Sequence, residues 1–110
     1  MGSRRQTQVS ETIAHHAADF FARESNHESL ITVTHADISP DLKNVTVYLS
    51  VLPEKMEKTA LAFAKRVRTD FREYLKTKDL LKFLPTVDFE LDYGEKNRQH
   101  VDEALRRGNN

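Results

Sequence analysis

The sequence lacks several residue types and patterns, and each absence excludes a class of protein. None of the 110 residues is cysteine, which excludes disulfide scaffolds, thiolate zinc sites and cysteine nucleophiles. The three glycines stand alone at positions 2, 94 and 108, so no glycine-rich loop for a nucleotide phosphate can be written. No long apolar run and no signal-peptide pattern is present. These absences fit a cytoplasmic protein with no membrane partner.

Neither sign of charge dominates the chain. It has 17 lysines and arginines against 17 aspartates and glutamates, so a polybasic nucleic-acid binder is not visible in the total. The charges are nevertheless unevenly placed, because residues 65–82 are strongly basic and residues 83–95 carry only acidic charges. Two interpretations remain open. In the first, the basic stripe contacts a phosphate backbone, while the acidic segment faces away or orients the encounter. In the second, both segments are ordinary solvated faces.

The spacing of apolar residues predicts one α+β domain. In chain order, the predicted elements are a helix over about 7–24, strands over 30–38 and 45–51, a helix over about 54–76, a strand over 87–91 and a weak final helix over 95–107. The short turn between the first two strands predicts that they pair antiparallel. We therefore expect a single domain over residues 1–110, with its core at about 7–92 and a tail at 93–110. Its three-stranded sheet should carry the helices on one face, as a two-layer sandwich.

Two groups of side chains suggest catalysis or metal binding, but neither is complete. His15 and His16 are adjacent, so on a helix they point about 100° apart and cannot chelate one ion together. Asp88, Glu90 and Asp92 alternate along a strand and project from one face, as paired catalytic carboxylates do. No nucleophile accompanies them. We therefore expect no metal, no cofactor and no enzymatic activity.

Four blocks of the sequence have the residues and spacing of one known family. They are Ser3-Arg4-Arg5 before the apolar residues Val9 and Ile13; residues 30–42, which end in Ser-Pro-Asp-Leu; the strand at 45–51 with Tyr48 and Ser50; and Phe71-Arg72 with Leu75, Lys82, Pro85, Phe89 and Asp92. From about residue 3 to residue 107, the chain thereby resembles ribosome-binding factor A, a bacterial small-subunit assembly factor. The resemblance implies a K-homology-like domain of αββααβ order, in agreement with the periodicity.

One position departs from the family pattern. Family members carry Ala-x-Gly at a kinked junction between two helices, and the aligned residues here are Val67-Arg68-Thr69. Two alternatives follow. Either the helix over about 54–76 runs straighter in this chain, or the kink forms without glycine. A local hydrogen bond from Thr69 to a carbonyl one turn back could then make it.

The resemblance implies a ribosome assembly factor that binds the immature small subunit through its rRNA. It further implies help in late maturation, including processing of the rRNA 5′ end, and a role in growth in the cold. Other assembly factors, such as a ribosome-assembly GTPase, are candidate partners of what we expect to be a monomer. The alternative is a protein-interaction module that uses an exposed sheet edge without touching RNA.

The predicted RNA contacts are basic side chains on the stripe and on the N-terminal segment. Four of them, Arg4, Arg5, Arg72 and Lys82, rest partly on matched family positions, and the others rest on the charge stripe. The full set is Arg4, Arg5, Lys65, Arg66, Arg68, Arg72, Lys76, Lys78 and Lys82.

Overall fold

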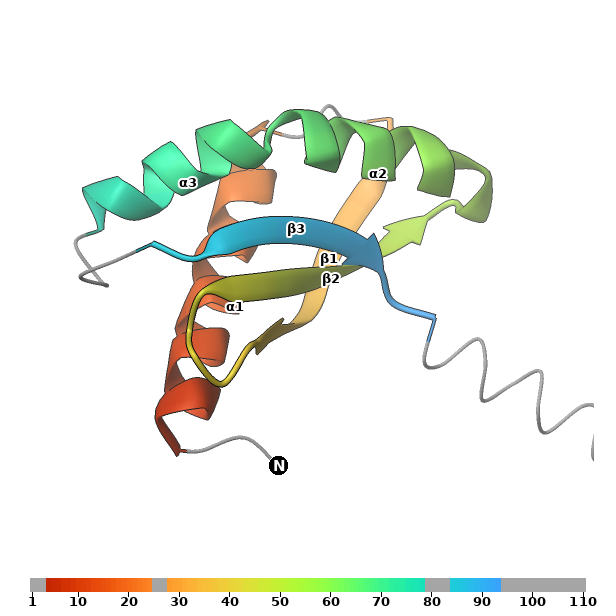
Figure 1. The fold of residues 1–110 in the computed structure, drawn as a ribbon. Helices are drawn as coiled ribbons and strands as arrows, with labels where there is room; N and C mark the ends of the chain where they lie inside the picture. The colour runs from red at the N-terminus through yellow and green to blue at the C-terminus, as the bar shows by residue number, and fades with distance from the viewer. Residues whose placement is uncertain (1–3, 25–27, 79–83, 94–110) are drawn as a thin grey trace, which may run out of the picture.

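The chain folds as an α+β domain of two layers (Figure 1). The computed structural model describes residues 4–24, 28–78 and 84–93. Its elements are the helix α1 (Arg4–Glu24), the strands β1 (Leu30–Ile38) and β2 (Asn44–Leu52), the short 3₁₀ helix η1 (Glu54–Met56), the helices α2 (Glu57–Arg66) and α3 (Arg68–Thr77), and the strand β3 (Thr86–Leu91). The predicted class is confirmed, and so is the predicted element order as far as β3. The predicted final helix over 95–107 lies outside the described residues.

The three strands form one mixed sheet in the order β1-β2-β3. The predicted antiparallel pairing of β1 with β2 is confirmed, and β3 lies parallel to β2. The parallel return is possible because η1, α2 and α3 supply the crossover. In β1 the register shifts between Val33 and His35, so Thr34 is the extra residue of a β-bulge. The bulge keeps Val33 and then Ala36 on the core side.

All helices pack on one face of this sheet, and the other face is open (Figure 1). The alternation in β2 shows the division, because Val45, Val47, Leu49 and Val51 are buried and the residues between them are not. Aromatic rings fill the space between the layers. The ring of Phe89 lies 5.1 Å from that of Phe21 and 5.6 Å from that of Phe71. No helix among the described residues has the length and apolar character needed to cross a membrane.

The helix predicted over about 54–76 is broken at Val67, which ends α2 and precedes α3. Val67 has φ −97° and ψ 14°, so the break needs no glycine. Its N–H is shared between the carbonyls three and four residues earlier, at 3.2 and 3.1 Å. Arg68 Nε donates to the carbonyl of Lys65 at 3.2 Å. The kink therefore forms without glycine, but the side-chain donor is the Arg68 guanidinium and not the predicted Thr69.

The helix α1 begins at Arg4, about three residues before the predicted start. Its first turn is held against the sheet, because Gln6 Nε2 donates to the carbonyl of Ile38 at 3.2 Å. Periodicity could not show this contact, since residues 4–8 are all polar. The contact places Arg4 and Arg5 beside the turn that joins β1 to β2.

Candidate nucleic-acid interface

The basic stripe and the acidic strand face each other. Lys65 Nζ lies 3.2 Å from Asp88 Oδ1 and 3.0 Å from Glu90 Oε1, and Arg68 Nη1 lies 3.1 Å from Asp88 Oδ1. Of the interpretations left open, the one in which the acidic segment faces away from the stripe is therefore wrong. β3 is the edge strand beneath α2 and α3, so long basic side chains reach around it to the carboxylates. We call Lys65, Arg68, Asp88 and Glu90 the edge clasp.

The pKa shifts of Lys65 and Asp88 in the edge clasp favour the charged form of both side chains. The hydrogen bond to Glu90 raises the pKa of Lys65 against the opposing effect of burial, and Asp88 raises it further. Burial pushes the pKa of Asp88 up, but the Phe89 N–H, Lys65 and Arg68 together bring it below its ordinary value. These side chains are all more than a third exposed, so each pair contributes at most about 1 kcal/mol.

Asp88 and Arg72 cover the outer edge of β3. Asp88 Oδ1 accepts a hydrogen bond from the Phe89 N–H at 2.9 Å, and Arg72 Nε donates to the carbonyl of Pro85 at 3.2 Å. A partner strand that docked on this edge would have to displace these contacts. An interaction module that uses a sheet edge would therefore have to use β1.

The nine predicted RNA contacts fall into three groups. Lys65, Arg68 and Lys76 are held by carboxylates, the last by Glu73 at 3.0 Å. Lys82 lies outside the described residues. Within the part of the chain that the structure describes, five have no carboxylate within ion-pair distance: Arg4, Arg5, Arg66, Arg72 and Lys78. Arg4 and Arg5 start α1 at the end of the domain away from α3 (Figure 1), so the structure does not gather the nine into one surface.

Lys78 and one further cation, Arg23, meet at the seam between α1 and α3. Lys78 Nζ lies 4.9 Å, and the Arg23 guanidinium 5.7 Å, from the centre of the Tyr74 ring. Arg66 lies over Phe63 in the same way, at 5.8 Å. Arg23 is not among the contacts predicted from the sequence, because only the packing of α1 against α3 brings it beside Lys78. An aromatic ring leaves a cation's positive charge uncompensated, so these side chains are available to a phosphate.

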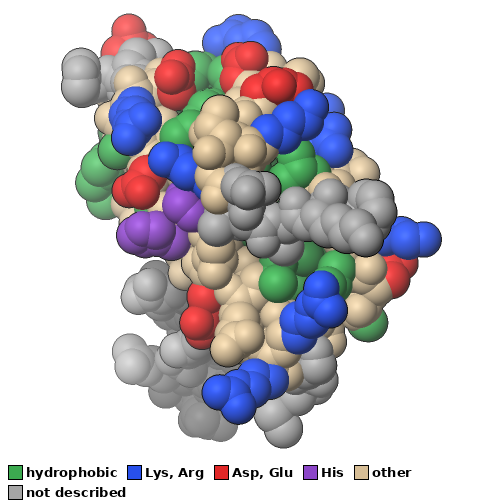
Figure 2. Space-filling view, turned by 90° about the vertical axis from the view of Figure 1, so that its left-hand side faces the viewer, with side chains coloured by type: hydrophobic (Ala, Val, Ile, Leu, Met, Phe, Trp, Pro, Cys, Tyr) green, Lys and Arg blue, Asp and Glu red, His purple; other side chains and the backbone are tan. Residues whose placement is uncertain are grey.

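The same seam holds both adjacent histidines. His16 packs edge-on against Tyr74 at 6.2 Å, and His15 Nε2 lies 3.6 Å from Asp19. Burial first, and then the charges of His15 and Lys78, lower the pKa of His16, so it is neutral at pH 7. Among the described residues no three His, Asp or Glu side chains gather as a metal site. In the view of Figure 2, histidine side chains gather at one place, and basic side chains form separate groups with acidic ones among them.

The carboxylates of β3 and the residue after it do not form a catalytic pair. Two of the three are held by Lys65, and Asp92 accepts a hydrogen bond from Thr34 Oγ1 at 2.7 Å. Asp92 Oδ2 also lies 3.5 Å from His35 Nδ1, and the His35 ring stacks on Tyr48 with a centroid distance of 4.5 Å. The carboxylates are thus divided between two structural contacts on the open face of the sheet.

Comparison with known proteins identifies the family. The model of the family described as ribosome-binding factor A matches residues 5–105. Ribosome-binding factor A of Bradyrhizobium sp. (strain ORS 278) is 32% identical over 110 residues, which cover 96% of this chain and 80% of the relative.

Two solved structures share the fold. The crystal structure of ribosome-binding factor A from Thermus thermophilus superposes with a TM-score of 0.70 at 20% identity, covering 78% of this chain and 94% of that one. A homology model of T. thermophilus ribosome-binding factor A, fitted into a cryo-electron-microscopy map of a 30S complex, superposes with a TM-score of 0.65 at 20% identity, covering 74% of this chain and 89% of that one. This chain therefore belongs to the ribosome-binding factor A family, a family of binding proteins and not of enzymes.

Proposed function

We propose that this protein binds the immature small ribosomal subunit through its rRNA and assists the last steps of its maturation. Family membership supports the proposal, as does the T. thermophilus relative fitted into a 30S complex. The observation that carries it is the set of uncompensated cations along α2, α3 and the α1–α3 seam. Arg23, Arg66, Arg72 and Lys78 present positive charge without a carboxylate among the described residues. Such cations gain affinity for RNA by releasing counterions from phosphates.

The edge clasp contributes less to RNA binding than its charge suggests. A phosphate that approaches Lys65 or Arg68 must first displace Asp88 or Glu90, which already satisfy these donors. Lys76 is in the same position with Glu73. The remaining predicted contacts, Arg4 and Arg5, lie at the start of α1 and would meet a separate stretch of backbone.

The mechanism is differential binding and not chemistry. A protein that binds one rRNA conformation more tightly than another shifts the population towards the preferred one. A tenfold preference corresponds to about 1.4 kcal/mol, which one or two phosphate contacts can supply. Holding rRNA in a conformation that processing enzymes accept would assist maturation of its 5′ end. The same bias would matter most in the cold, where RNA helices rearrange slowly.

The proposal includes a monomeric, cytoplasmic protein with a K-homology-like fold, and other assembly factors as later partners. A ribosome-assembly GTPase is the candidate among them. No chemical group of the described residues is required to act on the rRNA itself.

The test is the salt dependence of binding to a fragment of small-subunit rRNA. About five phosphate contacts predict a slope of log K against log salt of roughly −3.5 to −4.5. The variant Arg66→Ala/Lys78→Ala should weaken binding and flatten the slope by roughly 1.4 to 1.8. The matched control Lys55→Ala/Lys58→Ala removes two exposed cations from η1 and the first turn of α2, away from α3 (Figure 1). Equal losses in both variants would show that net charge, and not this surface, determines binding.

A further inference from the structure

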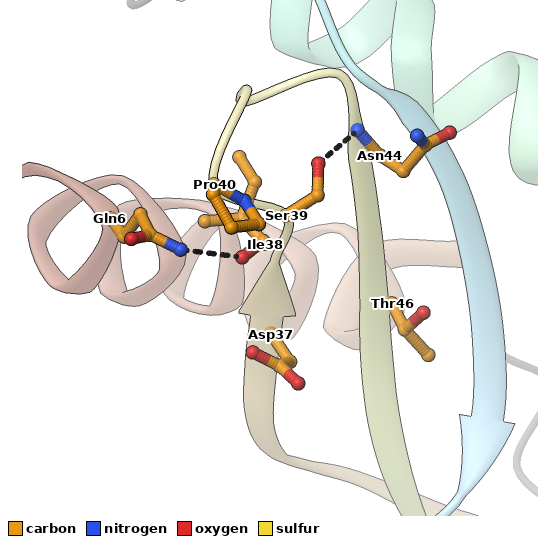
Figure 3. Close-up of a pocket in the computed structure, with 7 residues that line it drawn as sticks. All are labelled: Gln6, Asp37, Ile38, Ser39, Pro40, Asn44 and Thr46. Atoms are coloured by element: carbon orange, nitrogen blue, oxygen red, sulfur yellow. Dashed lines mark hydrogen bonds between the residues drawn. The ribbon is translucent and has the colours of Figure 1, made fainter. Parts of the chain in front are cut away.

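A polar pocket lies where the turn between β1 and β2 meets the start of α1 (Figure 3). Its volume is about 460 Å³, and its lining includes Gln6, Asp37, Pro40, Asn44 and Thr46. Asp37 and Thr46 are cross-strand partners, so their side chains project from the same face of the sheet. None of these residues belongs to the cationic surface on α2 and α3.

The turn that shapes the pocket is held by its own hydrogen bonds. Ser39 Oγ donates to Asp41 Oδ1 and accepts a bond from the Asn44 N–H at 3.1 Å, and the Lys43 N–H donates to Asp41 at 3.0 Å. The hydrogen bond from Gln6 to Ile38 fixes the helix beside it (Figure 3). The pocket is therefore present before any ligand binds.

Three hydrogen-bonding side chains of this pocket are unused. Among the described residues, the carboxylate of Asp37, the side-chain amide of Asn44 and the hydroxyl of Thr46 have no hydrogen-bond partner. Pro40 also lines the pocket, and its exposed ring offers an apolar surface. A carboxylate, an amide and a hydroxyl are groups with which proteins hydrogen-bond the edges of an unpaired base.

The carboxylate selects among the four bases. Guanine has two adjacent donors, N1–H and N2–H₂, on its Watson–Crick edge, which match the two oxygens of a carboxylate. Adenine and cytosine present a ring-nitrogen lone pair beside their amino group, and uracil flanks its single N–H with carbonyl oxygens. In adenine, cytosine and uracil, an acceptor atom of the base would therefore face a carboxylate oxygen of Asp37 and be repelled by it.

We propose that this pocket holds one unpaired guanine of the bound RNA, with Asp37 accepting its N1–H and N2–H₂ groups. Asn44 and Thr46 can donate to the acceptors of the base. Arg4 and Arg5 directly precede Gln6, and Lys43 directly precedes Asn44, so basic residues adjoin the pocket lining at two points of the chain. Basic residues at two points beside a base pocket suit the phosphates on either side of one nucleotide, so the guanine belongs to an RNA strand. The inference rests on the proposed function and specifies the RNA feature that the protein recognises, an unpaired guanine.

The test uses the full chain with the fluorescent single-stranded RNAs UUGUU and UUAUU, and UUGUU with inosine in place of guanosine. UUGUU should bind roughly 5- to 150-fold more tightly than UUAUU, the range expected for one bidentate base contact. The inosine RNA, which lacks the amino group, should fall between them. Asp37→Asn should abolish the preference, because an amide presents one donor and one acceptor. The control Asp70→Asn makes the same charge change at an exposed site on α3 and should keep it.

Two-dimensional NMR of the labelled protein locates the contact independently of affinity. Addition of UUGUU should shift the amide signals of residues 37–46, and UUAUU should shift them less. Equal affinities for UUGUU and UUAUU, with an ordinary salt dependence, would overturn the guanine pocket and leave RNA binding intact. No binding of either RNA or of small-subunit rRNA would overturn both. Binding of GMP as tightly as UUGUU would overturn the assignment to an RNA strand.

Discussion

Releasing the edge clasp should strengthen RNA binding while it weakens the fold. The double variant Asp88→Asn/Glu90→Gln removes both carboxylates that hold Lys65 and Arg68. The asparagine amide oxygen can still accept the hydrogen bond from the Phe89 N–H, so the outer edge of β3 keeps this contact. The change therefore frees Lys65 and Arg68 from their ion pairs, so that both can contact phosphates beside Arg66.

The sizes of both effects follow from the structure. Two additional phosphate contacts should make the slope of log K against log salt more negative by roughly 1.4 to 1.8. The ion pairs of the clasp are partly exposed, with side chains 37–46% accessible, so their loss should cost about 1 kcal/mol of folding free energy. For a domain of this size that is a fall in Tm of roughly 4–8 °C.

Fluorescence anisotropy with an rRNA fragment and thermal unfolding measure the two effects on one sample. The control Glu11→Gln/Glu24→Gln changes the net charge equally on α1 without releasing a cation. Two results would refute the reasoning. One is equal gains in binding for variant and control. The other concerns the double variant Lys65→Ala/Arg68→Ala, made with Asp88 and Glu90 unchanged. If it loses as much RNA affinity as Arg66→Ala/Lys78→Ala, then Lys65 and Arg68 already contact RNA despite their ion pairs.

Three further predictions concern stability. The lowered pKa of His16 means that the unfolded chain protonates this side chain more readily than the folded one does, so the free energy of unfolding should fall as pH drops through about 6.5. In urea titrations at pH 7.5 and 5.5, His16→Leu should remove this fall. An unchanged fall in the variant would contradict the prediction. The lowered pKa of Asp88 contributes stability that is present above pH 3.8 and is lost as pH falls through the folded-state pKa. In acid titrations, Asp88→Asn should therefore lose less unfolding free energy than the unchanged protein. An equal loss in the variant would contradict the assignment. The Tyr74 hydroxyl is buried without a hydrogen-bond partner among the described residues, so Tyr74→Phe should leave the unfolding free energy unchanged or raise it by up to about 1 kcal/mol, and a clear decrease would reveal a partner.

The fold was predictable wherever a single segment determined its own structure. Strict alternation in β2 and the apolar face of α1 are local patterns, and both elements lie where periodicity places them. The break at Val67 was not predictable from periodicity, because the apolar face continues across it from Ala64 to Phe71. The resemblance to a family with a kinked junction raised the possibility. The identity of the donor, Arg68, required the structure.

The candidate site was less predictable than the fold, because it depends on contacts between distant segments. The sequence showed that residues 65–82 are basic and 83–95 acidic, but not that Lys65 and Asp88, 23 residues apart, would meet. It could not place Arg23 beside Lys78 for the same reason. The Ser-Pro-Asp-Leu segment was visible as a turn, and the pocket behind it follows only from the register of Asp37 with Thr46.

Sedimentation of a cell lysate through sucrose gradients tests the central claim most directly, with each fraction probed for this protein at low and at high salt. The account predicts that at low salt the protein migrates with free small subunits, enriched in those that carry unprocessed rRNA. It also predicts that high salt returns the protein to the top of the gradient, because phosphate contacts supply the affinity. Migration with light proteins alone at both salt concentrations would contradict the account.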